Sequence, residues 1–589
     1  MSRTVYCRTI FVVLIVFMLI SPSLATKSFN QCLQGIRDRT LSLDESYYES
    51  GGRTNNGTVV SISNTTSAIS YELCVVACGS DQEAFNWSAF SQEFSSWLLP
   101  WLALISQLPF GANDKFANFI SMLLAVGSPT LAAYSVMLTV LNSRWVARIF
   151  HKLKYPNVQS AVRILSSLQQ APVRVDRLDP YLLPSLVVLP ENDDWWTELR
   201  EHLEYTHTWS VSAATSIAWV VIAYIFTIID SFTADIGQLI EVNGQGVGSV
   251  WIWLLAVVFS WLQISPKCDS KRIDQALQRT NDLAYVATSD PLRPVRASSL
   301  NNHRAIYLRH GHGSLHADER CTAPIFNYSR VFTWSTTAEE VAECFRQAHG
   351  RVEIFEAVRG REEWVAGDRN TRVPKANRMG TAMEIRQYCR YYPEVEPVYR
   401  WGSGVWSRIF VASLMALFLQ WGTTGAAMAI VLMTPTRGLG CRSAAYLGYA
   451  CLSTLVWGLL VLSSILSHYS TFTTIDPIEG KPRFNLRSRI AADMSIFFRK
   501  LGKVIASVNA IGVVVINMFQ FSSFFNRCYC NSSVIGLGME NAYFVIEFHP
   551  DDINSTRLAW KGGSVLALGT AAIFVGVLNL LINPSLPEE

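Results

Sequence analysis

Histidines gathered between positions 303 and 316 are the side chains whose type and spacing come nearest to metal chemistry. His310 and His312 are separated by one glycine, a spacing that could turn two imidazoles toward one metal ion, with His316 close behind. A stable metal site also needs fixed geometry and further ligands, whereas Cys321 is the only nearby thiol and the neighbours include glycine and serine. We therefore interpret the tract as a polar loop and expect no metal ion or other cofactor.

Catalytic groupings of other kinds are also missing from the sequence. An acidic Asp-x-Asp motif, paired histidine boxes or a Ser/His/Asp arrangement would each indicate an enzyme, and none of them stands out. The sequence leans away from an enzyme, and a membrane-embedded enzyme is the least favoured of three function classes.

Polar side chains inside long apolar stretches are a better guide, because an ionisable group in a membrane interior is costly and stays only for a purpose. No charged residue sits in the middle of such a stretch here, so proton-driven transport and voltage sensing lose their usual carriers. The densest polar cluster runs from Gln420 to Ala427, where Gly422 and Ala426 lie one turn apart and allow two helices to approach closely. We favour tight helix packing for this cluster, with a pocket for an uncharged polar solute or lipid as the alternative. The candidate packing or pocket residues are Gln420, Gly422, Thr423, Thr424, Gly425, Ala426, Asn509, Asn517 and Gln520.

The chain that must position these groups is too apolar for an ordinary soluble protein. Half of its 589 residues are hydrophobic and only 16% are charged, and the net charge of +3 gives no reason to expect nucleic acid as a partner. Residues 1–25 have a basic start, an apolar run from Ile10 to Ile20 and a small-residue exit, which is the pattern of a cleaved secretory signal peptide. The mature chain is then expected to begin outside the cytosol.

Seven later stretches are long and apolar enough to cross a membrane as helices. An odd number of spans places the tail, 583–589, in the cytosol. One further apolar stretch, 97–109, is short and contains Pro100, so we expect it to lie at the outer interface or to dip in and return, within an outer segment 26–115. The predicted spans are 116–141, 209–232, 246–264, 406–433, 443–467, 504–525 and 564–582.

Lysine and arginine test this orientation, because they accumulate on the cytosolic flanks of spans. Basic residues follow the first and third predicted spans and precede the sixth, as in the run from Arg144 to Lys154. The predicted cytosolic segments are therefore 142–208, 265–405 and 468–503, while 526–563 is an outer loop.

Glycosylation sequons favour the same orientation, because they are modified only in the lumen of the secretory pathway. Five of the six Asn-x-Ser/Thr matches fall in predicted outer segments, whereas Asn327 falls inside and is expected to stay unmodified. The predicted glycosylation sites are Asn56, Asn64, Asn86, Asn531 and Asn554.

Cysteines in the outer segments are even in number, as expected in an oxidising compartment. They allow three disulfides with fifteen possible pairings, although Cys528 and Cys530 are too close in sequence to bridge each other without strain. The disulfide candidates are Cys32, Cys74, Cys78, Cys441, Cys528 and Cys530.

The first predicted cytosolic segment contains an acidic helix next to the second span. Asp193 or Asp194 can cap it, and its Trp195–Trp196 pair suits the membrane interface. Because its carboxylates would be repelled by anionic lipid, we expect the acidic face to meet protein, namely the basic second cytosolic segment.

The second cytosolic segment, 265–405, is the only one long enough for a domain of its own. A capping-box pattern predicts a helix from Thr336 to Gly350, and an apolar run predicts a strand at 352–358. A further helix is predicted at 381–391, so we expect a small α+β fold.

Long phrases of the sequence resemble a known group of proteins. The phrases are Gly127-Ser128-Pro129-Thr130-Leu131-Ala132-Ala133-Tyr134 and the stretch from Gln420 through Thr434-Pro435-Thr436-Arg437-Gly438-Leu439-Gly440-Cys441-Arg442-Ser443. They resemble a family of multi-pass membrane proteins predicted in many fungal genomes, and the likeness covers most of the chain. That family has no assigned activity, so the resemblance implies architecture and localisation and transfers no functional residue.

These observations predict an all-α transmembrane bundle of about seven spans, with a small α+β cytosolic insert between spans three and four. We expect a lipid-embedded protein of the secretory pathway, in the plasma membrane, with its N-terminus outside. Because one inner segment is far longer than any outer loop, the favoured function is a non-enzymatic sensor or scaffold, with a cytosolic protein partner bound through 265–405. The alternative is a channel or transporter for an uncharged polar solute or lipid, lined by Gln420, Asn509, Asn517 and Gln520.

Overall fold

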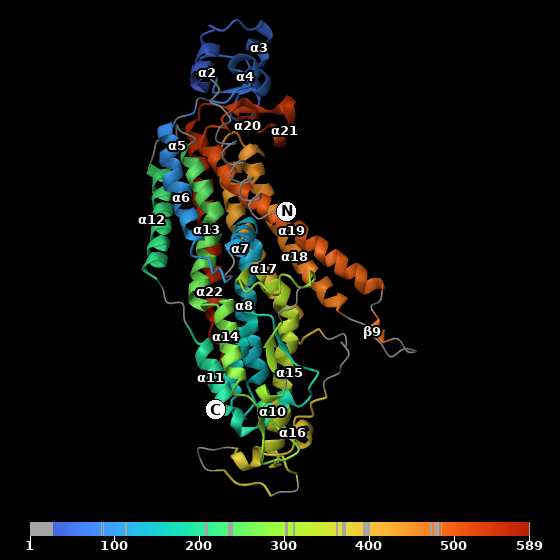
Figure 1. Cartoon of the computed structure of the whole chain (residues 1–589). Helices are drawn as coiled ribbons and strands as arrows, with labels where there is room; N and C mark the ends of the chain where they lie inside the picture. The colour runs from blue at the N-terminus through green and yellow to red at the C-terminus, as the bar shows by residue number, and fades with distance from the viewer. Residues whose placement is uncertain are drawn as a thin grey trace.

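The computed structural model describes residues 28–83, 85, 87–111, 115–205, 210–233, 240–300, 304–309, 313–360, 363–367, 373–392, 401–471, 474–475, 482–483 and 486–587. The molecule is elongated, with a small lobe at one end, a helical bundle in the middle and a second, larger part at the other end (Figure 1). We call the small lobe, residues 28–83 and 526–549, the cap lobe. We call the larger part, residues 145–205 and 268–392, the distal domain. The predicted signal peptide, 1–25, lies outside the described residues.

Five helices in the described part of the chain are long and apolar enough to cross a membrane. They are α13 Ile240–Ile264, through its part Gly246–Ile264, α17 Val405–Leu432, α18 Cys441–Ser470, α19 Leu486–Phe521 and α22 Pro550–Leu581. Their positions coincide with the third to seventh predicted spans. At the second, α12 Val211–Thr233 has a shorter apolar part, Val211–Phe226. These apolar helices are compatible with a multi-pass membrane protein.

The first predicted span, 116–141, is not one helix. The chain forms α7 Lys115–Gly127 and α8 Pro129–Phe150, and it turns by 104° between them. Ser128 leaves the helical conformation and caps α8, while Pro129 has no N–H to continue the hydrogen bonds of α7. The stretch is therefore two helices rather than one continuous helix, because the Ser-Pro pair outweighs the apolar pattern.

The stretch 97–109 lies within the helical bundle. It belongs to a nearly continuous helical segment formed by α5 Trp87–Glu93, the π-helix η1 Phe94–Leu98 and α6 Leu99–Ile105. Pro100 lies in the first turn of α6, where a proline costs no hydrogen bond. The segment packs against α12 and α13 inside the bundle, with Trp101 and Leu104 buried in the core.

The cap lobe is built from both ends of the chain. Its antiparallel sheet has the order β10-β3-β1-β2, in which Ile69 of β3 pairs with Phe544 of β10. Strand β3 lies near the N-terminus and β10 follows α19. The sheet therefore joins two parts of the chain that are far apart in the sequence. The elements are α2 Phe29–Arg37, α3 Glu45–Ser50, β1 Gly52–Arg53, β2 Val59–Val60, β3 Ala68–Ser70, α4 Tyr71–Cys78, α20 Cys528–Asn531, α21 Val534–Asn541 and β10 Tyr543–Val545.

The distal domain combines both predicted cytosolic segments around one hydrophobic core. Strand β4 of the first segment pairs with β7 of the second, so the insert 265–405 is not a separate α+β unit. Its elements are α9 Val158–Ser167, η2 Leu168–Gln170, β4 Val173–Val175, α10 Leu182–Val188, η3 Pro190–Asn192, α11 Asp193–Leu203, α14 Ser270–Asn281, β5 Tyr285–Val286, β6 Val295–Arg296, η4 Ala297–Ser299, β7 Ile306–Leu308, η5 Pro324–Phe326, α15 Asn327–Glu353, η6 Lys375–Arg378 and α16 Ala382–Tyr388. A small strand pair, β8 Thr474–Ile475 and β9 Pro482–Arg483, follows α18.

Several local predictions for this domain can be compared with the structure. The helix predicted at 381–391 is α16, and its capping box joins Thr381 and Glu384. The strand predicted at 352–358 is absent from the described chain there, because α15 runs on to Glu353 and turns follow. Trp195 and Trp196 were predicted at the membrane interface, yet both are fully buried in the domain core.

Candidate functional site

The break between α7 and α8 is held by polar side chains in the middle of the bundle. The Asn509 amide donates to the carbonyls of Gly127 (2.7 Å) and Tyr449 (3.1 Å), and the Tyr449 hydroxyl donates to Val126 (2.8 Å). Carbonyls at a helix end lack partners within the helix, and these bonds satisfy those at the end of α7. A Cβ on Gly127 would lie 1.9 Å from the carbonyl oxygen of Ala506, so only glycine allows α7 to approach α19 this closely.

The first turn of α8 is held in the same way by α18. The Ser128 hydroxyl accepts from the Leu131 N–H (3.2 Å) and donates to the Ser453 carbonyl (2.7 Å). The Ser453 hydroxyl accepts from the Thr130 N–H at 3.3 Å and contacts the Thr130 hydroxyl at 3.0 Å. All of these side chains are buried. We call this arrangement, Val126–Thr130 together with Tyr449, Ser453 and Asn509, the clasp.

Gln420 joins the clasp from the middle of α17. Its amide oxygen accepts from Ser453 at 3.5 Å, and its amide nitrogen donates to Thr424 at 2.8 Å. The structure therefore brings Gln420, Thr424 and Asn509 to one place beside the break. Of the three, only Asn509 bonds the broken backbone directly, whereas Gln420 acts through Ser453.

Other residues of the predicted cluster pack helices together. A Cβ on Gly422 would meet Thr570 of α22 at 2.4 Å, and one on Gly563 would lie 3.2 Å from the Ala426 carbonyl, so α17 and α22 are in close contact on this face. Thr423 bonds within its own helix, to the carbonyl of Leu419. Gly425 lies outside this helix contact, because a Cβ there would meet no neighbour within 4 Å.

The two remaining predicted amides lie on α19 between the clasp and the cap lobe. Gln520 accepts from the Tyr446 hydroxyl at 2.8 Å. Asn517 is 0% exposed, and neither its amide oxygen nor its amide nitrogen has a hydrogen-bond partner. A buried amide without hydrogen-bond partners costs about 1–3 kcal/mol of folding free energy, so Asn517 destabilises the folded state by about this amount.

Arg408 connects the bundle to the distal domain. It is 4% exposed, it donates to Asn142 of α8 (2.6 Å) and Ser335 of α15 (2.9 Å), and its guanidinium lies 4.0 Å from the ring centroid of Trp145. Beyond this point α8 continues into the core of the distal domain, where Phe150 is fully buried. One side chain therefore joins α17, α8 and α15.

Two adjacent carboxylates fix the distal domain to α19 and to itself, and we call them the carboxylate clamp. Asp318 accepts from Lys503 of α19 at 2.6 Å and from the Tyr328 hydroxyl. Glu319 accepts from Arg174 of β4 at 2.9 Å and from His316 at 2.8 Å. Both carboxylates are buried.

The charge partners of Glu319 decide its protonation. Burial raises the pKa of this carboxyl, but the hydrogen bond from His316 and the positive charge of Arg174 outweigh burial, so the pKa lies below its ordinary value. Glu319 is therefore ionised at neutral pH.

The disulfides tie the cap lobe together and to the bundle. The pairs are Cys32–Cys78, Cys74–Cys528 and Cys441–Cys530, so Cys528 and Cys530 do not bridge each other, as predicted. Cys441 is the first residue of α18, which makes its disulfide a covalent joint between cap lobe and bundle.

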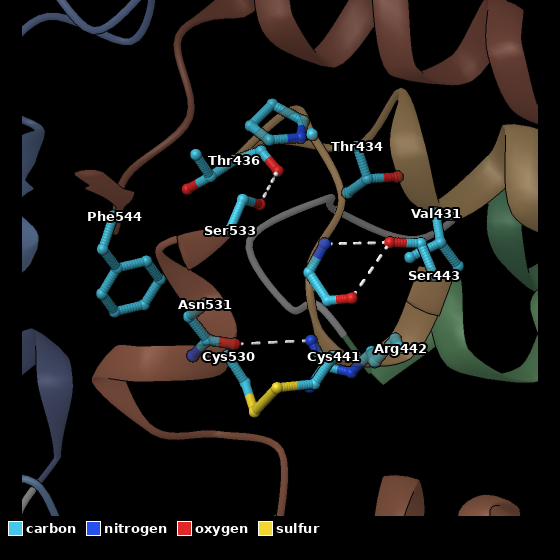
Figure 2. A pocket seen from close by; sticks show the side chains of 13 residues that line it. Val431, Thr434, Thr436, Cys441, Arg442, Ser443, Cys530, Asn531, Ser533 and Phe544 are labelled. Atoms are coloured by element: carbon cyan, nitrogen blue, oxygen red, sulfur yellow. Dashed lines mark hydrogen bonds between the residues drawn. A yellow bond between two sulfur atoms is a disulfide. The ribbon is translucent and has the colours of Figure 1, made fainter. Parts of the chain in front are cut away.

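A small cavity adjoins this joint (Figure 2). Its volume is about 50 Å³, which leaves room for only one or two water molecules at about 30 Å³ each. Arg442 donates to the Asn531 oxygen at 3.4 Å, and Ser533 donates to the Thr436 carbonyl at 3.1 Å. Residues Thr434–Ser443, which belong to one of the phrases that carry the family resemblance, thus form a packed connection between α17 and α18 next to the cap lobe.

The predicted sequons differ in accessibility. Asn56, Asn64 and Asn554 are exposed, whereas Asn531 is 8% exposed and its oxygen is bonded to Arg442. Asn86 lies outside the described residues, and Asn327, the sequon expected to be silent, is buried and donates to Thr139.

The histidine tract shows no metal geometry within the described residues, where no group of three or more His, Cys, Asp or Glu side chains could hold a metal ion. His316 is bonded to Glu319 of the carboxylate clamp. His310 and His312 lie outside the described residues.

Sequence reasoning missed the partners that complete these sites. Ser128 and Pro129 carry a readable signal, because serine followed by proline is the usual start of a helix. Asp318 carries none, since its partner Lys503 is 185 residues away.

Comparison with known protein families, curated proteins and solved structures finds no match. The resemblance to a fungal membrane protein family stays an expectation from the sequence, and the function must be argued from the geometry.

Proposed function

We propose that the protein is a non-enzymatic sensor or scaffold of the cell surface, which couples an outer cap lobe to a cytosolic distal domain. The observation that carries the proposal is the course of α8. One end of this helix is held by the clasp inside the bundle, and the other end is part of the distal domain core.

The connection from the cap lobe to the clasp runs through α18. Its first residue, Cys441, is bonded to the cap lobe, and Ser453, about three turns further along, holds the first turn of α8. A movement of the cap lobe is therefore transmitted to Ser128 through one covalent joint and one helix. Packed helix interfaces can switch between discrete arrangements. A change of arrangement at the cap lobe can therefore be passed along α18 to the clasp.

The sidedness in this proposal is supported by features of the cap lobe. It holds the disulfides Cys32–Cys78 and Cys74–Cys528 and one half of Cys441–Cys530, and disulfides form in oxidising compartments. It also exposes the sequons at Asn56 and Asn64. The basic residues that flank predicted spans lie toward the distal domain, as in Arg148 on the last turn of α8.

A cytosolic partner would bind the end of the distal domain farthest from the bundle (Figure 1). Directly after α15, Ile354 and Phe355 are 65% and 69% exposed, and the Phe355 ring contacts Trp364. Phe355 also has a positive φ of 56°, a conformation that is uncommon for a bulky residue. Exposed aromatic groups of this kind are enriched in protein interfaces.

The coupling is tested by cutting the covalent joint and observing the far end. In the variant Cys441→Ser/Cys530→Ser, we expect faster hydrogen exchange at residues 126–131 and along the distal half of α8. The matched control, Cys32→Ser/Cys78→Ser, removes a disulfide inside the cap lobe and should leave those segments unchanged. Equal exchange in both variants and the parent would show that the cap lobe does not act on α8.

The partner surface is tested with the full chain as bait in cells. Phe355→Asp should lose the captured proteins, whereas Leu178→Asp, at an isolated side chain that is 85% exposed, should keep them. Capture at background level by the parent protein would remove the support for a scaffold.

A pathway for an uncharged polar solute is the second candidate, and the observation that favours it is Asn517. Its unpartnered amide is what a solute passing between α18 and α19 could bind. Flux in proteoliposomes that is the same for the parent, Gln420→Leu and Asn517→Leu would exclude this role for the amides.

A further inference from the structure

The segment before α7 starts at the cap lobe end of the bundle. The Glu83 N–H donates to the Asn526 carbonyl at 3.0 Å, and the Asn526 amide donates back to the Glu83 carboxylate at 3.2 Å. Arg527 donates to the Gln82 oxygen at 3.1 Å. Because residues 526 and 527 follow α19 directly, the chain at residues 82–83 lies where α19 meets the cap lobe.

From there the segment runs antiparallel to α12 along its length. Trp101 contacts Tyr224 with ring centroids 6.4 Å apart, in the second half of α12. Gln107 donates to Ser212 at 3.5 Å, in the first turn of α12. The segment therefore extends through the bundle, as the helices α5 and α6 do beside α12 and α13 in Figure 1.

At its other end the segment reaches the distal domain. The Thr322 hydroxyl lies within hydrogen-bond distance of two carbonyl oxygens, those of Gly111 (3.0 Å) and Cys268 (2.6 Å). Cys268 comes just after the end of α13, and a Cβ on Gly111 would lie 2.3 Å from the Cys268 oxygen. Gly111 is thus fixed at the end of the bundle opposite to Glu83.

The helices α7 and α8 then begin and end on that same side. α7 starts at Lys115, four residues after Gly111, and packs against η5 of the distal domain and against α19. It leads to the clasp beside Gln420, near the middle of α17, and α8 returns to the distal domain core at Phe150.

We infer that residues 87–108 cross the membrane and that α7 and α8 form a re-entrant hairpin, which enters and leaves on the distal domain side with its tip at Ser128. The helices α5, η1 and α6 have 7, 5 and 7 residues, which at about 1.5 Å each extend about 28 Å, close to the ~30 Å hydrocarbon core. The one charged side chain in 87–111 is Glu93, which is 8% exposed.

This arrangement removes a conflict in the predicted topology. Counting 97–109 as an additional span would move the basic run Arg144–Lys154 to the outside. When α7 and α8 form a re-entrant hairpin, the crossing at 87–108 replaces the one at 116–141, and the parity of everything downstream is unchanged. Irregular backbone at membrane depth is tolerated only where it is buried in protein, and the clasp provides that burial.

The inference does not depend on the proposed function. It changes the side of the membrane on which residue 115 lies. Residues 88 and 115 lie on the same side if 116–141 is the first span, and on opposite sides if 87–108 is. Ser88 and Lys115 are both exposed, so a cysteine at either place should be tolerated.

The test is labelling of Ser88→Cys and Lys115→Cys with a membrane-impermeant maleimide, in the full-length protein in intact and in permeabilised cells. All variants carry Cys451→Ser, because Cys451 is the exposed free cysteine among the described residues. Ser46→Cys marks the cap lobe side and Arg346→Cys marks the distal domain side, both at exposed positions.

We expect Ser88→Cys to be labelled like Ser46→Cys, and Lys115→Cys like Arg346→Cys. Labelling of Lys115→Cys together with Ser46→Cys would overturn the inference, as would a Lys115→Cys thiol that stays unlabelled after permeabilisation. Monodisperse elution of each variant after purification, with the same thermal midpoint as the parent, shows that the fold is retained.

Discussion

Replacing Arg408 with lysine should loosen the joint between α17, α8 and the distal domain while keeping the positive charge. Arginine donates here in three directions, to Asn142, Ser335 and the Gly404 carbonyl, and it lies over the Trp145 ring. A lysine ammonium can keep one of these bonds but cannot reproduce the planar fork. The loss of two hydrogen bonds from a charged donor, at about 1.5–2 kcal/mol each, and of part of the ring contact, at about 0.5–1 kcal/mol, amounts to about 4 kcal/mol.

The assay is hydrogen exchange measured by mass spectrometry on the protein in detergent micelles. A destabilisation of about 4 kcal/mol corresponds to a roughly 1000-fold change in the opening equilibrium, so amides in the distal half of α8 and the first half of α15 should exchange about 100- to 1000-fold faster. Arg487→Lys, at an exposed position on α19, is the control and should change nothing. Exchange within threefold of the parent in Arg408→Lys would refute the reasoning, because the three bonds would then contribute nothing to the joint.

Three further predictions concern the clasp, the carboxylate clamp and the sequons. Ser453→Ala removes the side chain that bonds the first turn of α8 and should lower stability by about 1–2 kcal/mol, seen as a lower thermal midpoint, whereas an unchanged midpoint would mean that the break does not need it. The depressed pKa of Glu319 contributes stability that is present above the unfolded-state pKa of about 4.3 and is lost as pH falls below it, so Glu319→Gln should flatten the acid limb of a fluorescence titration. Asn531→Gln should leave gel mobility unchanged because this side chain is buried, whereas Asn64→Gln should remove one glycan and with it the corresponding glycosidase shift.

The amides illustrate what the sequence could reveal. Gln420 and Asn509 stand out because polar side chains are costly in apolar stretches, and the structure indeed places both at one site. The sequence could not show that they come together, because they lie on α17 and α19 and are connected only through α18, where Ser453 bonds Gln420 and the Tyr449 carbonyl accepts from Asn509. A serine in an apolar helix is common, since it can bond its own backbone, so Ser453 gives no local signal.

The two prolines near the break show how a single residue can mislead a prediction of membrane spans. Pro100 argued against a span at 97–109 because proline interrupts a helix, yet at the first turn of α6 it has no bond to lose. Conversely, the apolar pattern of 116–141 argued for one span and hid the turn at Ser128. In both stretches the position of the proline within the helix matters more than the average hydropathy.

The distal domain could be predicted only in pieces. The helix at Thr381 and the acidic helix α11 are readable because their signals are local. The acidic face of α11 does not meet the second segment as expected, because Glu198 and Glu201 are exposed and Glu204 pairs with Arg163 of its own segment. Only Asp193, at the start of the helix, pairs with Arg378 of the second segment. The burial of Trp195 and Trp196 depends on α14, where Asn281 accepts from Trp195 at 3.2 Å. That contact joins two segments separated by α12 and α13, and no local pattern records it.

The energetic cost of the break between α7 and α8 is an argument that the break serves a function. An unbroken helix over 116–141 would satisfy its backbone without help, whereas the broken one depends on side chains of α18 and α19 for the groups at its two new ends. Each such group would cost about 1–3 kcal/mol if left unpaired, so losing the clasp while keeping the break would be unfavourable. The turn at Ser128 makes α8 start inside the bundle, bound to a helix that is tied to the cap lobe, and end inside the distal domain. A straight helix would not place the first turn of α8 against Ser453 inside the bundle, and the joint between that turn and the distal domain core would be lost.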